Sequence, residues 1–255
     1  FNDNGGPQTL SGPSAMQMEF QVNAFAYESN DEINDITFYE YKLINKSSDD
    51  LLDCYFSWWV DPDLGCYTDD FFGCDPSRNM AYVYNEDALD GSTECLGSNT
   101  YGEDIPILGF DFVNGPMVSK VFKRDINGNF IFDNQGKKVI LDPDPMSGKQ
   151  DTLVEGRMSS FCYMATNGID GFPIATDYPQ FGQETGFYNY IRGLWADGTP
   201  YSYGDSGFNP TPTDTVKFAF PDDPNDNSGW SMCTAGLPED DRTFVMSTGP
   251  MLMQP

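Results

Sequence analysis

The stretch WWVDPDLGCYTDDFFGCD, residues 58–75, joins an aromatic, strand-like run to a loop rich in carboxylates. The aspartates of this stretch are Asp61, Asp63, Asp69, Asp70 and Asp75. Because like charges repel one another, an ordered loop of this composition needs a positive charge at its centre. Oxygen ligands at irregular spacing suit Ca²⁺, which accepts about six to eight of them in flexible geometry. We therefore predict a structural calcium ion bound by these five aspartates, with a solvated acidic surface loop as the alternative.

The amino-acid composition favours an all-β protein. The chain has 255 residues, and its 20 Phe, 14 Tyr, 25 Gly and 18 Pro are typical of strands joined by tight turns. This length suffices to bury a full core within one domain. We expect a single extracellular domain, residues 1–255. Its expected architecture is a β-sandwich of the jelly-roll type with long loops, one or two short helices and a β-hairpin insertion.

The charge balance is strongly acidic, with a formal net charge of −27 from 40 acidic and 13 basic residues. This balance disfavours nucleic acid and anionic membrane surfaces as partners, since both require basic patches. The chain has no histidine, which removes the Ser-His-Asp arrangement and the commonest transition-metal ligand. No apolar run approaches the roughly 18 residues that a membrane helix needs. Self-repulsion of the compact state again favours a bound divalent cation.

The six cysteines indicate disulfide bonds. They are Cys54, Cys66, Cys74, Cys95, Cys162 and Cys233, and none of them belongs to a CxxC pair of the kind found in zinc sites and thioredoxin-like proteins. Disulfides form in oxidising compartments, so this usage favours an extracellular protein. We expect Cys66 to pair with Cys74, closing the acidic loop, and Cys162 to pair with Cys233. Six cysteines allow other pairings, which stay open.

Alternation of apolar and polar residues predicts strands along most of the chain, after an extended lead-in at residues 1–14. The expected strands cover residues 16–28, 36–45, 51–60, 79–85, 105–113, 157–166, 216–220, 230–234 and 243–252. The first two are expected to form a hairpin, and residues 105–113, the most apolar run, are expected to cross the core. One short helix is predicted at residues 186–195, where Phe187, Tyr190, Ile191 and Leu194 follow helical spacing.

Residues 117–145 are expected to form the β-hairpin insertion. A turn at residues 125–129 contains Asn127-Gly128, a pair typical of hairpins. The sequence DINGNFIFD, residues 125–133, also begins like an EF-hand calcium loop. It departs from that motif at Phe130, where the motif has glycine, and at Gly136, where the motif has a bidentate glutamate. A hairpin turn is therefore favoured, and a second calcium site is the alternative.

Five segments carry a resemblance to known proteins. They are AFAYESNDEINDITFYEYKL at 24–43, the WVDPDLG and DDFFGCDPSRNMAYVYN block within 55–85, ILGFDFVNGP at 107–116, FYNYIRGLWADGTPYSYG at 187–204 and DRTFVMSTGPMLMQP at 241–255. In this order they resemble a conserved region of large cell-surface proteins that Bacteroidota export through the type IX secretion system. The resemblance implies an adhesin-like or surface-layer component and a chain that is a piece of a longer polypeptide. It also implies O-glycosylation at Asp-Thr followed by an apolar residue, which selects Thr152 and Thr215.

These observations favour a non-catalytic extracellular module, structural or adhesive, that is stabilised by calcium and disulfides. Its expected partners are neighbouring domains of the same polypeptide or other copies in a surface assembly. A carbohydrate-binding module is the main alternative, with glycans as the partner. A glycoside hydrolase is the third possibility, because two carboxylates suffice for that chemistry. Under both alternatives, aromatic side chains such as Trp58, Trp59, Trp195 and Tyr201 would stack on sugar rings.

Overall fold

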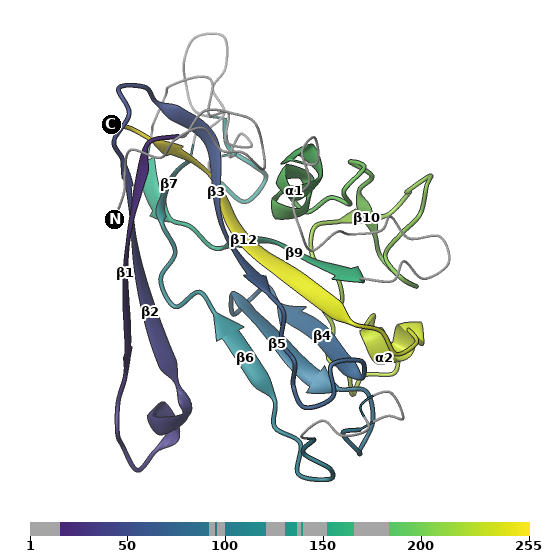
Figure 1. Cartoon of the computed structure of the whole chain (residues 1–255). Coiled ribbons are helices and arrows are strands. Elements are labelled where there is room, and N and C mark those ends of the chain that lie inside the picture. Colours follow the sequence, from purple (N-terminus) through teal and green to yellow (C-terminus); the bar gives the residue numbers. More distant parts are fainter. Residues whose placement is uncertain are drawn as a thin grey trace.

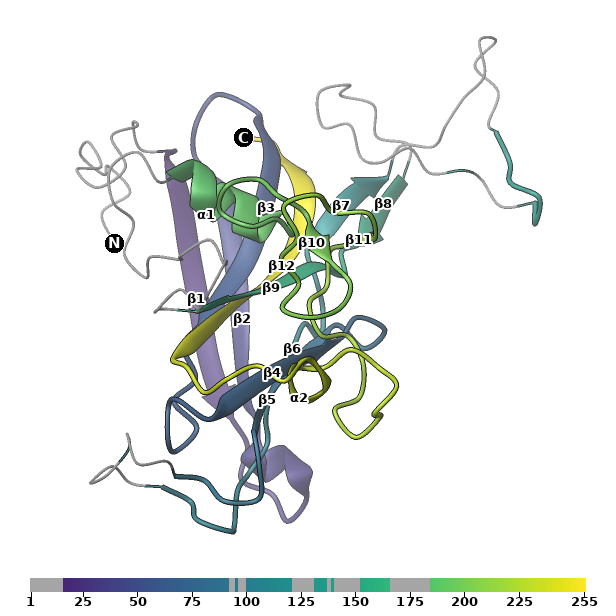
Figure 2. The same ribbon diagram turned by 90° about the vertical axis from the view of Figure 1, so that its right-hand side faces the viewer.

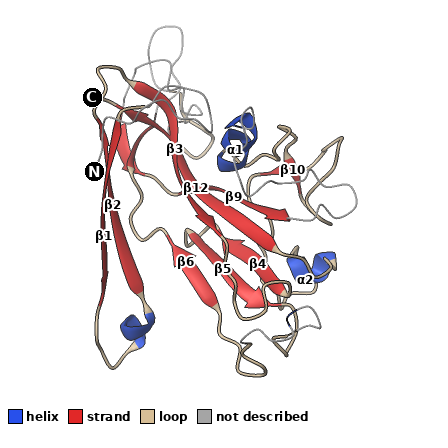
Figure 3. Ribbon diagram, in the orientation of Figure 1, coloured by secondary structure: helices blue, strands red, loops and turns tan. Residues whose placement is uncertain are grey.

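The computed structural model describes residues 16–91, 95, 100–120, 131–136, 139, 152–165 and 184–255, and for 117–120 and 152–155 it describes the backbone alone. Strands dominate this part of the chain and short helices accompany them (Figure 3). The predicted all-β class is confirmed. The described strands form five sheets of two or three strands each, so the jelly-roll sandwich stays a prediction.

The elements follow one another along the chain with these bounds. The strands are β1 (Met18–Ala26), β2 (Thr37–Asn45), β3 (Leu51–Val60), β4 (Asp70–Asp75), β5 (Met80–Asn85), β6 (Leu108–Asp111), β7 (Met117–Lys120), β8 (Thr152–Glu155), β9 (Met158–Ala165), β10 (Tyr201–Ser202), β11 (Thr215–Val216) and β12 (Arg242–Met253). The helices are η1 (Glu32–Asp35), α1 (Glu184–Ile191) and α2 (Met232–Ala235).

The sheet β3–β12–β9 lies at the centre of the molecule, and β12 pairs antiparallel with both of its neighbours (Figure 1). In this register Met246 of β12 lies opposite Trp58 of β3 and Phe161 of β9. Since successive side chains of a strand point to opposite faces, the alternating apolar residues of the three strands form one apolar face. All three strands lie where the sequence pattern predicted them.

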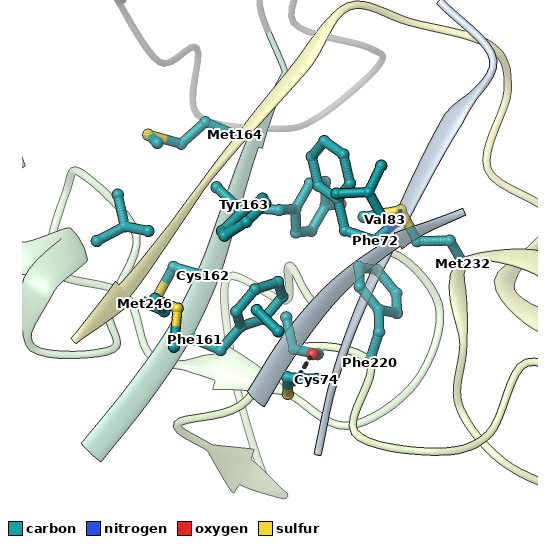
Figure 4. Packing of buried hydrophobic residues seen from close by; sticks show 14 of the residues in the cluster. Phe72, Cys74, Val83, Phe161, Cys162, Tyr163, Met164, Phe220, Met232 and Met246 are labelled. Carbon is teal, nitrogen blue, oxygen red and sulfur yellow. Dashed lines mark hydrogen bonds between the residues drawn. The ribbon is translucent and has the colours of Figure 1, made fainter. Parts of the chain in front are cut away.

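The hydrophobic core lies between this apolar face and the sheet β4–β5–β6. The ring centroids of Phe72 on β4 and Phe110 on β6 lie 5.2 and 5.4 Å from that of Phe244 on β12. Figure 4 shows core side chains of β4, β5, β9 and β12 gathered together with Phe220 and Met232. Aromatic pairs at such separations contribute about 0.5–1.5 kcal/mol each beyond their buried area. Phe244 therefore joins the two sheets, as does Trp58 of β3, whose ring centroid lies 6.1 Å from that of Phe110.

The strands β1 and β2 form a long hairpin beside the core. They pair over nine residues without a break in register, from Met18 opposite Asn45 to Ala26 opposite Thr37, which confirms the predicted hairpin. The hairpin contacts the rest of the molecule through Tyr41, whose ring centroid lies 5.0 Å from that of Phe56 on β3. β1 lies on the outer side of the hairpin, away from β3 (Figure 1).

Three predicted strands differ from the structure. Of residues 216–220, only Val216 belongs to a strand, β11. Residues 230–234 contain the start of helix α2 instead of a strand, because Ser231 and Thr234 form a capping box at the helix N-terminus. Of residues 105–113, only β6 is a strand, and it forms the edge of the sheet β4–β5–β6. This run therefore does not cross the core; Leu108 is exposed, while Phe110 and Phe112 farther along pack against the core. The predicted helix is present as α1, but it ends at Ile191, and residues 192–195 lie outside it.

β7 pairs with β8, so the described strand pair joins residues 117–120 to 152–155, and the predicted insertion at 117–145 begins with β7. Residues 133–136 form a turn, since the backbone N–H of Gly136 donates to the carbonyl of Asp133 at 3.0 Å. Residues 125–130 of the EF-hand-like sequence and the lead-in at 1–14 lie outside the described residues. In Figure 2 the β7–β8 pair lies well away from the β1–β2 hairpin.

Candidate functional site

The acidic stretch divides into a loop and a strand. Residues 61–69 form the loop that leaves β3, and residues 70–75, predicted as part of the same loop, form strand β4. β4 pairs with β5 along its whole length, from Asp70 opposite Asn85 to Asp75 opposite Met80. Phe71, Phe72 and Cys74 of β4 all belong to the core, which is why a segment with an acid at each end becomes a buried strand.

A disulfide bond joins this loop to the next one. Cys66 pairs with Cys95, which lies in the loop between β5 and β6. The predicted pairings of Cys66 with Cys74 and of Cys162 with Cys233 are wrong. β4 carries Cys74 away from the loop and into the core, where its thiol donates to the carbonyl of Ala219 at 3.3 Å. The Cys162 thiol is also buried, whereas Cys233 is exposed on α2.

Asp90 organises the contact between the two loops. Its Oδ1 accepts a hydrogen bond of 2.8 Å from the backbone N–H of Cys66, and its Oδ2 accepts one from the backbone N–H of Tyr101. Gly65 makes this approach possible, because a Cβ at that position would lie 1.9 Å from Asp90 Oδ2. Gly65 also has a φ of +82°, which favours glycine. Asp90 is thus a structural centre that the sequence alone did not single out; its proximity to Cys95 was the available signal.

Asp69 and Asp70 lie side by side in the chain and are both buried, with 5% and 2% of their surface exposed. The Oδ2 of Asp69 accepts a hydrogen bond of 3.0 Å from the backbone N–H of Gly91. The Oδ2 of Asp70 accepts one of 2.8 Å from the backbone N–H of Leu64. The Oδ1 atom of each aspartate is buried and has no hydrogen-bond partner. Unpaired buried carboxylate oxygens are costly and require a proton or a cation.

Burial shifts the protonation of both carboxyl groups. Burial, together with the nearby charges of Asp69, Asp90 and Asp63, raises the pKa of Asp70 to about 8, against the opposing effect of the hydrogen bond from the Leu64 N–H. Burial likewise raises the pKa of Asp69, with Asp90 adding to the effect. The raised values reflect a site without positive charge nearby. A bound cation would reverse this balance by favouring the ionised form.

The five predicted ligands do not form one site. Asp63 lies near Asp70, since its charge raises the pKa of that group, but both Asp61 and Asp63 are exposed. Asp75 lies at the far end of β4 from Asp70, roughly 17 Å away at about 3.3 Å per residue. There its Oδ1 accepts hydrogen bonds from the backbone N–H and hydroxyl of Ser77 at 2.9 and 2.5 Å. Asp75 therefore shapes the β4–β5 turn and is not a ligand of the same ion.

The residues near Asp70 provide only part of a calcium site. In the portion of the chain that is described, no group of three or more Cys, Asp or Glu side chains is arranged to hold a metal ion. Asp69 and Asp70 contribute one free buried oxygen each. The remaining ligands of a calcium ion would be main-chain carbonyls and water, both of which Ca²⁺ accepts. Of the five predicted calcium ligands, Asp69 and Asp70 are thus the two that fit a calcium site.

The chain matches no protein-family model, no curated protein and no solved structure. Within the described residues, no helix is both long and apolar enough to span a membrane.

The two predicted O-glycosylation sites, Thr152 and Thr215, lie outside the acidic stretch. Thr215 is exposed at the start of β11, and Thr152 begins β8, where its side chain is not described.

A shallow apolar hollow of about 270 Å³ lies between α1 and the central sheet. Its lining consists of Ser57, Trp59, Phe187, Tyr190, Ile191 and Val245. Trp59 stands at this hollow with 47% of its surface exposed, whereas Trp195 is fully buried and stacks on Tyr201. The Ser57 hydroxyl is already paired with that of Ser247 at 2.8 Å. Of the aromatic residues considered for sugar stacking, Trp59 is the most accessible candidate, and polar partners for a sugar are few around it.

Proposed function

We propose that this chain is a non-catalytic structural module of a secreted bacterial surface protein, of the type IX secretion kind that its sequence resembles. In this role the module is held together outside the cell by the Cys66–Cys95 disulfide and by a calcium ion in the loop that the disulfide fixes. The observation that carries the proposal is the pair of buried, unpaired oxygens of Asp69 and Asp70 within this fixed loop.

The charge of the whole chain supports the cation. With a net charge of −27, the protein gains stability from any divalent ion that binds only the folded form. Asp69 and Asp70 are held by the loop before an ion arrives, since each already accepts one backbone hydrogen bond. Binding then requires little reordering of the chain. In this role the two carboxylates stabilise the fold by binding the cation and take no part in a chemical reaction.

Thermal unfolding at pH 7 in calcium and in a chelator tests the cation. We expect calcium at about 2 mM to raise the Tm by several degrees over the chelated protein, as saturation about a hundredfold above Kd contributes about 2.7 kcal/mol. Asp70→Asn should abolish the calcium response. Asp75→Asn is the matched control and should retain the response, because Asp75 lies at the opposite end of β4. Equal melting temperatures with and without calcium would contradict the cation site.

Protease treatment of intact producing cells tests the cellular role. A surface module is expected to release its peptides into the medium before the cells lyse, as detected by mass spectrometry. A cytoplasmic protein of the same cells serves as the lysis control. Retention of the chain inside protease-treated cells would overturn the surface assignment without bearing on calcium.

A carbohydrate-binding role is the second candidate, and the exposed Trp59 is the observation that favours it. Sugar rings stack on accessible aromatic faces, and the apolar hollow beside Trp59 would seat one edge of a sugar. Under this alternative, binding to a glycan array is lost in Trp59→Ala and kept in Leu52→Ala, an exposed residue of the same strand. An array without any bound glycan counts against the alternative and leaves the structural role intact.

A further inference from the structure

The outer edge of β1 is a long strand edge without the usual protection. Its nine residues pair with β2 on one side only, and no described strand pairs with the other side. Soluble proteins protect such edges with proline, lysine or a β-bulge, since unpaired N–H and C=O groups accept strands from other molecules. β1, MEFQVNAFA, has no proline and no lysine, its register is continuous, and its one charge is Glu19. Among the described residues, nothing therefore closes this edge to a further strand.

Apolar side chains are exposed along the same strand. Phe20 and Val22 point to one face of the hairpin and have 46% and 49% of their surface exposed. Two small residues, Ala24 and Ala26, follow on that face toward the tip. Large exposed apolar groups on a regular edge are the features of an interaction surface. Large side chains near the start of β1 and small ones near the tip therefore make the two ends of this surface different.

We infer that two copies of the chain associate through β1, paired antiparallel about a two-fold axis at Val22. Only this register pairs all nine residues, because residue numbers of opposed partners then sum to 44 and Met18 meets Ala26 of the second copy. Phe20 then lies opposite Ala24, so a large side chain meets a small one at each end. The four strands β2–β1–β1–β2 form one sheet with a continuous apolar face.

The charge distribution favours a second copy as the occupant. The strands β1 and β2 together with Lys46 carry two acidic residues, Glu19 and Glu40, and two basic ones, Lys42 and Lys46. The charges of these paired strands therefore balance, although the chain as a whole has a net charge of −27. Antiparallel pairing also places the root of each hairpin, where Lys46 lies, beside the tip of the other. The residues around that tip carry four acids, Glu28, Asp31, Glu32 and Asp35.

The β1 edge is thus the surface through which copies of the chain would meet in a surface assembly. The association depends on this edge and requires no ion at Asp69 or Asp70, so its test is separate from the calcium test. Figure 1 shows β1 on the side of the hairpin away from the core. Because a two-fold pairing occupies the β1 edge of both copies, association stops at the dimer.

Sedimentation velocity over a range of concentrations tests the dimer. The unaltered chain is expected to sediment as a monomer–dimer equilibrium, in calcium and in chelator alike. Val22→Lys places two ammonium groups opposite each other on the axis and should weaken association at least about tenfold. Val113→Lys is the matched control, since Val113 is an exposed valine after β6, and it should leave association unchanged. Circular dichroism and Tm verify that both variants fold.

A cysteine trap tests the register. Paired residues on antiparallel strands have Cα separations of about 4.5–5.5 Å, within the range of disulfides. Val22→Cys in a Cys233→Ser background is expected to form a disulfide-linked dimer on mild oxidation, and Cys233→Ser alone should not. A monomer at about 100 µM, a dimer unaffected by Val22→Lys, or assemblies that grow beyond the dimer would each overturn the inference.

Discussion

At the scale of single residues, Asp90 and Gly65 show how one carboxylate organises a loop through backbone hydrogen bonds. Asp90 accepts two backbone hydrogen bonds from different parts of the chain, at Cys66 and Tyr101. A carboxylate with several N–H partners orders a loop much as a cation does, with the opposite charge. The carboxylates at this end of the β4–β5 sheet therefore have two different tasks. Asp90 binds backbone amides with both oxygens, whereas Asp69 and Asp70 each keep one oxygen free.

We predict that Gly65→Ala destabilises the protein more than Gly102→Ala, by about 2 kcal/mol. Both glycines have positive φ, +82° and +65°, so both substitutions strain the backbone. A Cβ at Gly65 meets the Asp90 carboxylate, whereas one at Gly102 meets nothing within 4 Å. Denaturant unfolding of both variants measures the difference. Equal destabilisation would show that Asp90 does not lie against Gly65.

We predict that Asp70 makes the chelated protein less stable as the pH rises. Its folded pKa of about 8 lies above the ordinary value of 3.8, so between these values the folded state binds more protons than the unfolded state. This contribution is fully present below about pH 4 and is lost as the pH rises toward 8. Unfolding free energies measured in chelator between pH 5 and 8 should fall less steeply for Asp70→Asn than for the unaltered chain. Parallel curves for the two proteins would refute the prediction.

At the scale of elements, the disulfide Cys66–Cys95 connects the loop before β4 to the loop after β5. The two bonded cysteines are 29 residues apart in sequence. Cross-linking a loop of this length restricts the unfolded chain and stabilises the fold by roughly 3.5 kcal/mol in the chain-entropy model. The strands β4 and β5 lie between the two loops, so the bond closes the sheet end that carries Asp70 and Asn85.

We predict that Cys66→Ser and Cys95→Ser lower the unfolding free energy by the same amount, up to roughly 3.5 kcal/mol, and that the double variant adds little. Peptide mapping without reduction should recover one linked pair, Cys66 with Cys95. An alkylating reagent should modify Cys233 in the folded protein and Cys74 and Cys162 only after unfolding, because both are buried. A linked Cys66–Cys74 peptide would contradict the structure.

Several elements were predictable because their signals are local. The hairpin β1–β2, the strands β3, β9 and β12 and the helix α1 follow their residue patterns closely. The errors occurred where a neighbour decides the outcome. Helix α2 is set by the hydrogen bonds of Ser231 and Thr234, which outweigh the aromatic and β-branched residues that favoured a strand. β6 is apolar yet lies at a sheet edge, a position that only the pairing with β5 determines.

At the scale of the whole molecule, the excess of negative charge lowers the stability of the fold by self-repulsion, which dissolved salt screens. We predict that raising sodium chloride from about 20 mM to about 500 mM raises the Tm, because the Debye length shrinks from about 20 Å to about 4 Å and self-repulsion weakens. A scan of Tm against salt measures this. Calcium at about 1 mM scarcely changes the ionic strength, so any further rise it causes reports a specific site. A Tm that falls with added salt would show that favourable ion pairs outweigh the repulsion.

The sequence by itself determined the all-β class, the acidic character and most strands, because composition and alternation act within a few residues of each position. It also indicated a cluster of carboxylates next to a cysteine. Only the tertiary structure decided which of these groups meet: β4 carries Asp75 and Cys74 away from the loop, and Asp90 and Cys95 arrive from beyond β5. The reason is that strand pairing separates residues close in sequence and joins distant ones, and local patterns contain no record of that pairing.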